Sequence, residues 1–93
     1  MRKVREVYRQ GETEPFAILY EEDGRMSAAS SDKEVEENLN RYFESLRNAF
    51  SFARVPQHLE ELEPTIFNYA SRWDHSTTFI MSEVREEKEA AAG

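Results

Sequence analysis

The chain has 93 residues, of which 39% are hydrophobic, and its 12 Lys and Arg against 19 Asp and Glu give a formal charge of −7. This length suits one small domain with a modest core, which excludes a nucleotide-binding fold joined to a separate substrate domain. The absence of cysteine excludes disulfide scaffolds, thiolate metal sites and cysteine nucleophiles, and favours a reducing compartment.

The first third of the sequence predicts strands joined by tight turns. Residues 3–10 are rich in Val and Tyr, and residues 16–20 form a short unbroken apolar run. Asp23 and Gly24 separate this run from residues 25–29, which also read as a strand. A two-residue Asp-Gly connection favours a type I′ hairpin, because both of its residues must adopt positive φ.

A long amphipathic helix is predicted next. Ser31 and Glu34 fit a capping box, in which a hydroxyl and a carboxylate bind free backbone N–H groups at the start of a helix. Apolar side chains then recur at three- and four-residue spacing, which predicts a stripe that packs on the sheet. The stripe consists of Val35, Leu39, Tyr42, Phe43, Leu46, Ala49 and Phe50. On the opposite side of this helix, Glu37 and Arg41 have the spacing of a weak ion pair.

The connector after this helix predicts a short helical segment. Pro56 and Pro64 mark its two ends, because proline is not tolerated in the interior of a helix. Leu59 and Leu62 lie between the two prolines at helical spacing. We expect one or two helical turns that bury both leucines.

The last third predicts a second hairpin and a tail. In residues 65–73 large aromatic residues recur at alternate positions, as in a strand, and residues 77–84 also have the composition of a strand. These two segments are interpreted as paired strands. The side chains on one side of the first segment are Phe67, Tyr69 and Trp73. Residues 83–93 are charged and then rich in Ala, which favours a frayed helix or a disordered tail.

These elements predict the α+β class. We expect a single two-layer domain over residues 1–86, with an antiparallel sheet of about five strands in the order β-β-β-α-β-β. One long helix would cover one face of the sheet, and residues 87–93 would form the tail. Residues 1–10 contain no apolar run of signal-peptide length, and no apolar run is long enough to span a bilayer. The expectation is a cytoplasmic protein without a membrane segment.

Charge is distributed unevenly along the chain. Residues 1–10 contain Arg2, Lys3, Arg5 and Arg9 against Glu6, whereas the rest of the chain is strongly acidic. Such a field repels phosphates, so direct binding of nucleic acid is disfavoured. Bunched carboxylates suit either a soluble surface or attraction of a basic partner.

The sequence contains no catalytic or metal-binding motif. Asp74, His75 and Ser76 have the residue types of a serine triad, but triad members face one another across a fold instead of following one another in sequence. A polar turn in which Asp74 accepts local backbone N–H groups is the better interpretation. His58 and His75 lack the spacing of metal ligands, and no glycine-rich phosphate loop is present. We expect neither enzyme activity nor a cofactor nor a metal.

The leading hypothesis is a small acidic interaction or regulatory module that binds another protein. One version is an inhibitor that mimics nucleic acid through Glu34, Glu36, Glu37, Glu60, Glu61 and Glu63. Tyr, Trp and Arg concentrate binding energy at protein interfaces. The predicted partner-binding residues are Tyr69, Trp73, Arg72, Phe52, Glu36 and Glu37.

Two alternatives from other classes stay open. The first is a homo-oligomeric scaffold, such as a homodimer, which pairs sheet edges or uncovered sheet faces across a two-fold axis. The second is a single-stranded nucleic-acid-binding domain, which would use sheet aromatics together with the basic residues 1–10.

Overall fold

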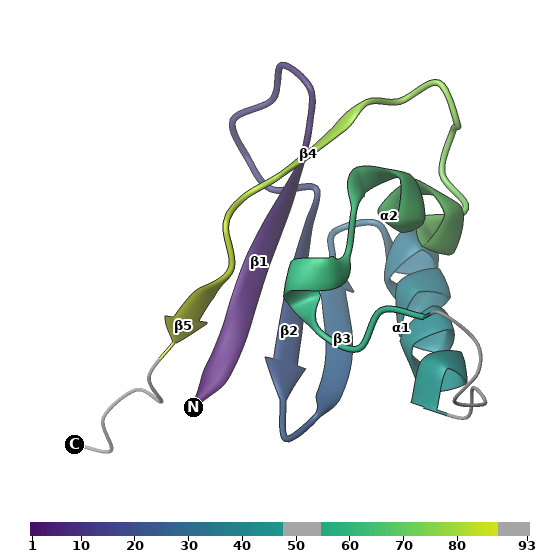
Figure 1. The fold of residues 1–93 in the computed structure, drawn as a ribbon. Coiled ribbons are helices and arrows are strands. Elements are labelled where there is room, and N and C mark those ends of the chain that lie inside the picture. The colour runs from purple at the N-terminus through teal and green to yellow at the C-terminus, as the bar shows by residue number, and fades with distance from the viewer. Residues whose placement is uncertain (48–54, 88–93) are drawn as a thin grey trace.

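The computed structural model describes residues 1–47 and 55–87 (Figure 1). Its elements in chain order are β1 (Arg2–Arg9), β2 (Ala17–Glu22), β3 (Arg25–Ser30), α1 (Lys33–Arg47), the 3₁₀ helix η1 (Leu59–Glu61), α2 (Pro64–Ser71), β4 (Phe79–Met81) and β5 (Arg85–Glu87). The predicted α+β class and the antiparallel five-stranded sheet are confirmed. Within the described residues there are two α-helices, α1 and α2, instead of a single long one.

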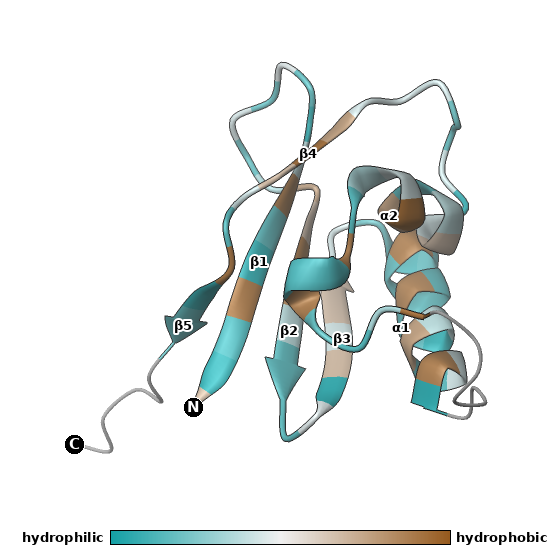
Figure 2. Cartoon of the chain, in the orientation of Figure 1, coloured by the Kyte–Doolittle hydropathy of each residue, from teal (hydrophilic) through white to brown (hydrophobic). Residues whose placement is uncertain are grey.

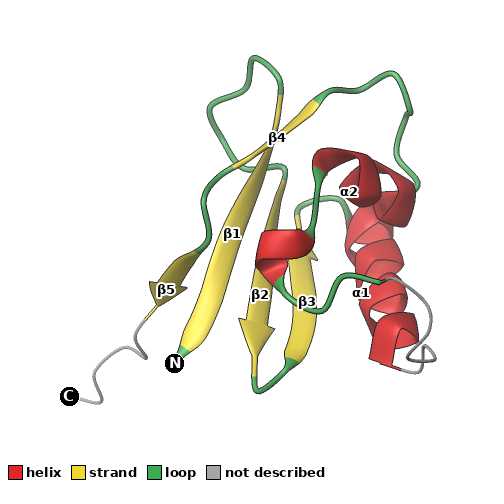
Figure 3. Cartoon of the chain, in the orientation of Figure 1, coloured by secondary structure: helices red, strands yellow, loops and turns green. Residues whose placement is uncertain are grey.

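Strand β1 is the centre of the sheet, whose order is β3-β2-β1-β4 (Figure 3). On one side β1 pairs with β2, where Val4 lies opposite Tyr20. On the other side Tyr8 lies opposite Ile80 of β4, and Val4 lies opposite Arg85 of β5. Strands β4 and β5 therefore share one side of β1 as two short pieces.

The predicted hairpin between β2 and β3 is confirmed. Asp23 has φ of 53° and Gly24 has φ of 75°, as a type I′ turn requires. Glycine adopts positive φ without steric cost, and Asp tolerates it better than most residues.

Helix α1 begins with a different cap from the predicted one. Asp32 is the capping residue, because its Oδ1 accepts the Val35 N–H at 3.1 Å. The Glu36 carboxylate reaches back to the Ser30 N–H at 3.0 Å. The prediction of Ser31 and Glu34 as a capping box was wrong, since the neighbouring Asp32 caps the helix and Glu36, the next glutamate, binds the backbone before it.

The apolar stripe of α1 packs into the core as predicted. Val35, Leu39 and Phe43 are buried, and Tyr42 and Leu46 are partly buried against the same cluster. The last predicted members of the stripe, Ala49 and Phe50, lie outside the described residues.

Residues 65–73 do not form the predicted strand. Helix α2 covers Pro64–Ser71, with proline at a first-turn position where its missing N–H costs no intrahelical hydrogen bond. Phe67, Ala70 and Ser71 are buried at helical spacing, whereas Tyr69 is 71% exposed. The apparent second hairpin therefore does not exist, and β4 pairs with β1 instead.

The end of the chain also differs from the prediction. Arg85–Glu87 form β5, and the pairing of Lys3 with Glu86 and of Arg2 with Glu87 holds them on β1. A frayed helix is therefore wrong for these three residues. Strand β5 ends one residue beyond the domain boundary expected at residue 86, and residues 88–93 lie outside the described part.

The core joins one face of the sheet to both helices and η1. Hydrophobic segments recur along β1 and along α1 and α2 (Figure 2). Leu59 and Leu62 are buried, as predicted. Phe16 anchors an aromatic group, with ring centroids 5.0 Å from Trp73 and 5.4 Å from Phe79. No helix in the described ranges has both the length and the apolar character needed to cross a membrane.

Candidate functional site

A groove of about 450 Å³ lies between α1 and α2. We refer to it as the α1–α2 groove. The side chains that give it its chemistry are Asn38, Arg41, Tyr42, Tyr69, Arg72 and His75. They come from the outer side of α1, the exposed side of α2 and the turn that follows α2.

The α1 wall of the groove follows from helical spacing. Asn38, Arg41, Tyr42 and Ser45 lie three, four and seven positions apart, so they share one side of the helix. The Asn38 Nδ2 donates a hydrogen bond to the Ser71 carbonyl at 3.0 Å, which ties α1 to the end of α2. This hydrogen bond therefore fixes the end of α2 against α1 beside the groove.

Two tyrosines meet across the groove. The ring of Tyr69 on α2 lies edge-on to the ring of Tyr42, with centroids 6.3 Å apart and an interplanar angle of 80°. Burial raises the pKa of the Tyr42 hydroxyl, and the neighbouring Tyr69 acts in the same direction. The Tyr42 phenol is thus protonated at neutral pH and is able to donate a hydrogen bond.

Arg72 ends α2 in a backbone conformation that is unusual for its residue type. Its φ is 56° and its ψ is 30°, in the left-handed region, and its N–H donates to the Tyr69 carbonyl at 3.3 Å. Glycine or asparagine is the usual residue at such a helix end, because other side chains are strained there. The sequence places a long cation at a position where the backbone alone favours glycine.

The two groove arginines are without ionic partners in the described part of the chain. Neither the Arg41 nor the Arg72 side chain makes an ion pair or a hydrogen bond with a described residue. The predicted ion pair between Glu37 and Arg41 is therefore not formed. Although the chain carries a charge of −7, the lining of the groove, as far as the structure describes it, contains Arg41, Arg72 and His75 and no carboxylate.

A smaller pocket of about 250 Å³ adjoins the groove. Asn38 and Arg72 line both cavities, and Glu34, Trp73 and Asp74 give the smaller one an aromatic and acidic character. The Ser76 N–H donates to Asp74 Oδ1 at 3.0 Å, which confirms the predicted polar turn. Hydrogen bonds from Ser76 lower the pKa of Asp74, so this carboxylate is ionised at neutral pH.

The structure brings together only part of the predicted partner-binding set. Tyr69 and Arg72 line the groove, and Trp73 lines the adjoining pocket while it also contacts Phe16. Glu37 is exposed on α1, whereas Glu36 is half-buried and bound to the Ser30 N–H. Phe52 lies outside the described residues.

Sequence reasoning did not find Arg41, Tyr42 and His75 as neighbours of Tyr69. The sequence pattern alone places Tyr42 in the core stripe and Arg41 in an ion pair with Glu37. The signal was the polar stripe on α1 that starts at Asn38, which has the same helical spacing as the core stripe beside it. It could be recognised only once residues 65–71 were known to be a helix.

The basic residues of β1 are engaged within the chain. Arg2 forms an ion pair with Glu87, and Lys3 Nζ lies 3.0 Å from a Glu60 carboxylate oxygen. Arg9 lies 2.8 Å from a Glu12 carboxylate oxygen. Because their charges are already neutralised by neighbouring acids, these cations are poorly suited to binding the phosphates of a nucleic acid.

The face of the sheet away from the helices is covered by its own side chains. Val4 is only 1% exposed, although it lies on the opposite side of β1 from the core residue Val7. It lies opposite Tyr20 and Arg85, and the Arg2 guanidinium stacks over the Tyr20 ring at 4.5 Å. The burial of Val4 and its register with these long polar side chains indicate that they shield it on this face.

Both edges of the sheet are protected against pairing. On β3, Asn40 of α1 accepts the Ala28 N–H at 2.9 Å and donates to the Ala28 carbonyl at 3.0 Å. These are the backbone groups that an added strand would bind. The opposite edge consists of the short, separate strands β4 and β5, which suit an added strand poorly.

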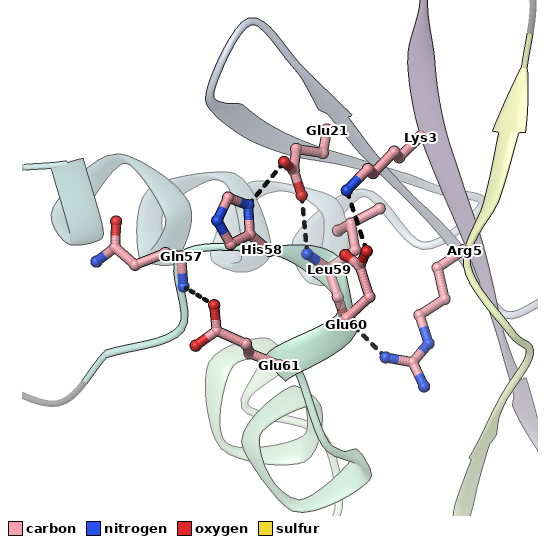
Figure 4. A network of polar contacts seen from close by, with 8 residues as sticks. All are labelled: Lys3, Arg5, Glu21, Gln57, His58, Leu59, Glu60 and Glu61. Carbon is pink, nitrogen blue, oxygen red and sulfur yellow. Dashed lines mark hydrogen bonds and ion pairs between the residues drawn. The ribbon is translucent and has the colours of Figure 1, made fainter.

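A polar network fastens η1 to the sheet (Figure 4). The buried carboxylate of Glu21 on β2 accepts the Leu59 N–H at 2.9 Å and lies 3.0 Å from His58 Nδ1. Arg5 donates to the carbonyls of Leu59 and Leu62 at 2.7 and 3.0 Å. Each group in this network has a partner within the chain, so the network serves to hold η1 in place.

The described residues contain no group of three or more His, Cys, Asp or Glu side chains placed to hold a metal ion. Comparison with protein families, with curated proteins and with solved structures gave no match to this chain. The assignment of a function therefore rests on the geometry of the groove.

Proposed function

We propose that this chain is a small, non-catalytic interaction module that binds another protein through the α1–α2 groove. The observation that carries the proposal is the exposed Tyr69 beside the arginines Arg41 and Arg72, which have no ionic partner among the described residues. Tyrosine and arginine are the residue types most enriched among the energetic centres of protein interfaces. The cysteine-free composition supports a cytoplasmic setting.

The groove suits a protruding side chain or loop of a partner. Its volume of about 450 Å³ lies within the size range of specific binding pockets. Asn38 fixes the two helices that form its walls through its hydrogen bond to Ser71. A preformed site of this kind loses little conformational entropy when a partner binds.

A regulatory role by acidic mimicry of nucleic acid is a narrower form of the same proposal. It would depend on Glu34, Glu37 and Glu63, since Glu36, Glu60 and Glu61 are each engaged by a backbone N–H or by Lys3. Reversal of the charges of the first three residues should then abolish binding of the partner. Unchanged affinity would leave the groove as the sole basis of the interaction.

The proposal is tested by affinity capture of the tagged chain from a lysate of its source organism, treated with nuclease. We expect a stoichiometric protein partner that the Tyr69→Ala variant loses by about tenfold or more, as for an interface residue of central importance. Ile80→Ala is the matched control, because Ile80 is 51% exposed on another surface. Recovery that depends on nucleic acid, or capture that Tyr69→Ala leaves intact, would contradict the proposal.

A further inference from the structure

We infer that the α1–α2 groove and its adjoining pocket recognise a mixed-charge peptide segment, with an oxyanion held by Arg41 and Arg72 and a cation held beside Trp73. This inference rests on the proposed function and names the chemical class of the bound segment. The oxyanion is a carboxylate or a phosphate, each of which offers a pair of acceptor oxygens that one guanidinium can bind through two parallel hydrogen bonds.

The groove supplies the donors that an oxyanion needs. The guanidinium groups of Arg41 and Arg72 make no ion pair or hydrogen bond with any described residue, so their fork of N–H groups is free for a ligand from outside. The protonated Tyr42 hydroxyl adds a neutral donor at the same wall. The described lining residues include no carboxylate that would repel the oxyanion.

The conformation of Arg72 is a second, independent observation. Its guanidinium makes no hydrogen bond or ion pair with the described residues, and its φ of 56° favours glycine. Strained residues that local packing does not require are concentrated at functional sites. Arg72 lines both cavities, so its side chain stands at their junction.

The adjoining pocket indicates which kind of side chain lies next to the oxyanion in the bound segment. Glu34 and the ionised Asp74 bring two negative charges to it against the one positive charge of Arg72. Trp73 adds a partly buried aromatic ring of the kind that attracts cations. A lysine or arginine of the bound segment fits this chemistry. A continuous polyanion does not, because the phosphate that followed the first would meet these two carboxylates. The two cavities together therefore favour a peptide over a nucleic acid.

The inference is tested by ¹⁵N-HSQC titration of the full chain with phenyl phosphate, benzoate, benzylamine and oligothymidylate as separate probes. Phenyl phosphate and benzoate should shift the amides of Arg41, Tyr69 and Arg72 in a saturable manner, and benzylamine those of Glu34 and Trp73. Oligothymidylate should produce no saturable shift. A larger response to phenyl phosphate than to benzoate would identify a phosphorylated segment, and the reverse an acidic one.

Two variants separate recognition from folding. Arg72→Gly should fold at least as well as the wild type, because glycine relieves the left-handed strain, yet it should weaken phenyl phosphate binding about tenfold. Arg41→Gln should have the same effect on binding. Arg25→Gln is the matched control, because Arg25 is an exposed arginine on β3 and should leave binding unchanged.

Absence of saturable shifts at the groove, or binding by Arg72→Gly and Arg41→Gln as strong as that of the wild type, would overturn the inference. Saturable binding of oligothymidylate at the same amides would also overturn it. A partner captured through Tyr69 but insensitive to both arginine variants would leave the proposed function standing while this inference fails. If the probes bind at the groove but the chain captures no protein partner, the proposed function fails while the oxyanion chemistry of the groove stands.

Discussion

Glu21 and His58 illustrate how single residues fix a segment that has little regular structure of its own. Glu21 is 9% exposed, and its two carboxylate oxygens face the Leu59 N–H and the His58 imidazole. A buried carboxylate without such donors would be costly. The pair thereby couples the placement of η1 to the protonation state of an accessible histidine.

The stability of the fold should depend on pH through His58. The hydrogen bond to Glu21 and its negative charge raise the pKa of His58 in the folded state. Protonated His58 is therefore stabilising below the unfolded-state pKa of about 6.5, and this contribution is lost as the pH rises through the higher folded-state value. Because the imidazole is 58% exposed, solvent screening keeps the effect small.

Urea unfolding of the wild type and of His58→Gln at about pH 5.5 and about pH 8.5 measures this effect. The wild type should be the more stable of the two at the lower pH, and the difference should shrink at the higher pH. Glu21→Gln keeps an acceptor for the Leu59 N–H but removes the negative charge. In this background, the effect of His58→Gln on the free energy of unfolding should depend less on pH. A difference that grows with pH would contradict the assignment.

At the scale of secondary-structure elements, the sequence predicts an element best where the local residues are compatible with a single backbone conformation. The Asp23-Gly24 turn and the stripe of α1 are of this kind, because positive φ and helical spacing leave few alternatives. Residues 65–73 were different, since Phe67, Tyr69 and Trp73 alternate as in a strand. Pro64 at the start of α2 was the opposing signal, and the packing of Phe67 and Ala70 decided in favour of the helix.

The groove could not be predicted because its two walls are far apart in sequence. Tyr69 and Arg72 were selected as partner-binding residues for their type alone. Their neighbours Arg41 and Tyr42 depend on α2 packing against α1, and that packing follows from the helix that sequence reasoning missed. A single error in assigning one element thus concealed half of the candidate site.

Asn40 should matter more for stability than its place on an amphipathic helix suggests. Its side chain binds both backbone groups of Ala28 on the edge strand β3. We expect Asn40→Ala to lower the free energy of unfolding by about 1–2 kcal/mol, because two part-buried backbone groups lose their protein partner. Urea unfolding measures the change.

Glu37→Ala on the same helix is the control for this prediction. Glu37 is exposed, and its substitution should change the free energy of unfolding by no more than about 0.5 kcal/mol. A loss in Asn40→Ala as small as that of the control would show that water replaces the side chain at the β3 edge. Asn40→Ala should also associate more readily with other copies of the chain, because the β3 edge becomes free to pair.

At the scale of the whole molecule, the surfaces that could support a homodimer are largely closed. Asn40 blocks one edge of the sheet, β4 and β5 form only a short and interrupted second edge, and the Arg2, Tyr20 and Arg85 side chains cover Val4 on the open face. The charge of −7 adds repulsion between copies. These features disfavour the homo-oligomeric alternative.

We therefore expect a monomer in sedimentation velocity experiments over a wide concentration range. Ile80→Lys should leave the sedimentation coefficient unchanged, because the 51% exposed Ile80 is then an isolated apolar residue on a solvated surface. Tyr69→Ala should likewise have no effect. A dimer that Ile80→Lys dissociates would instead identify the open sheet face as an interface and revive that alternative.

The pairing of β1 with β5 has a consequence for the newly made chain. Arg2 and Glu87 are 85 positions apart, so β1 leaves the ribosome long before the strands that complete its second side. At about 5–20 residues per second, this interval lasts about 4–17 s. Throughout it, β1 has one unpaired edge, which is a hazard for aggregation. The arginines and lysine of β1 oppose such contacts as gatekeepers. Arg9 and Lys3 find their ionic partners Glu12 and Glu60 earlier in synthesis, whereas Arg2 acquires its partner only once residue 87 has been made.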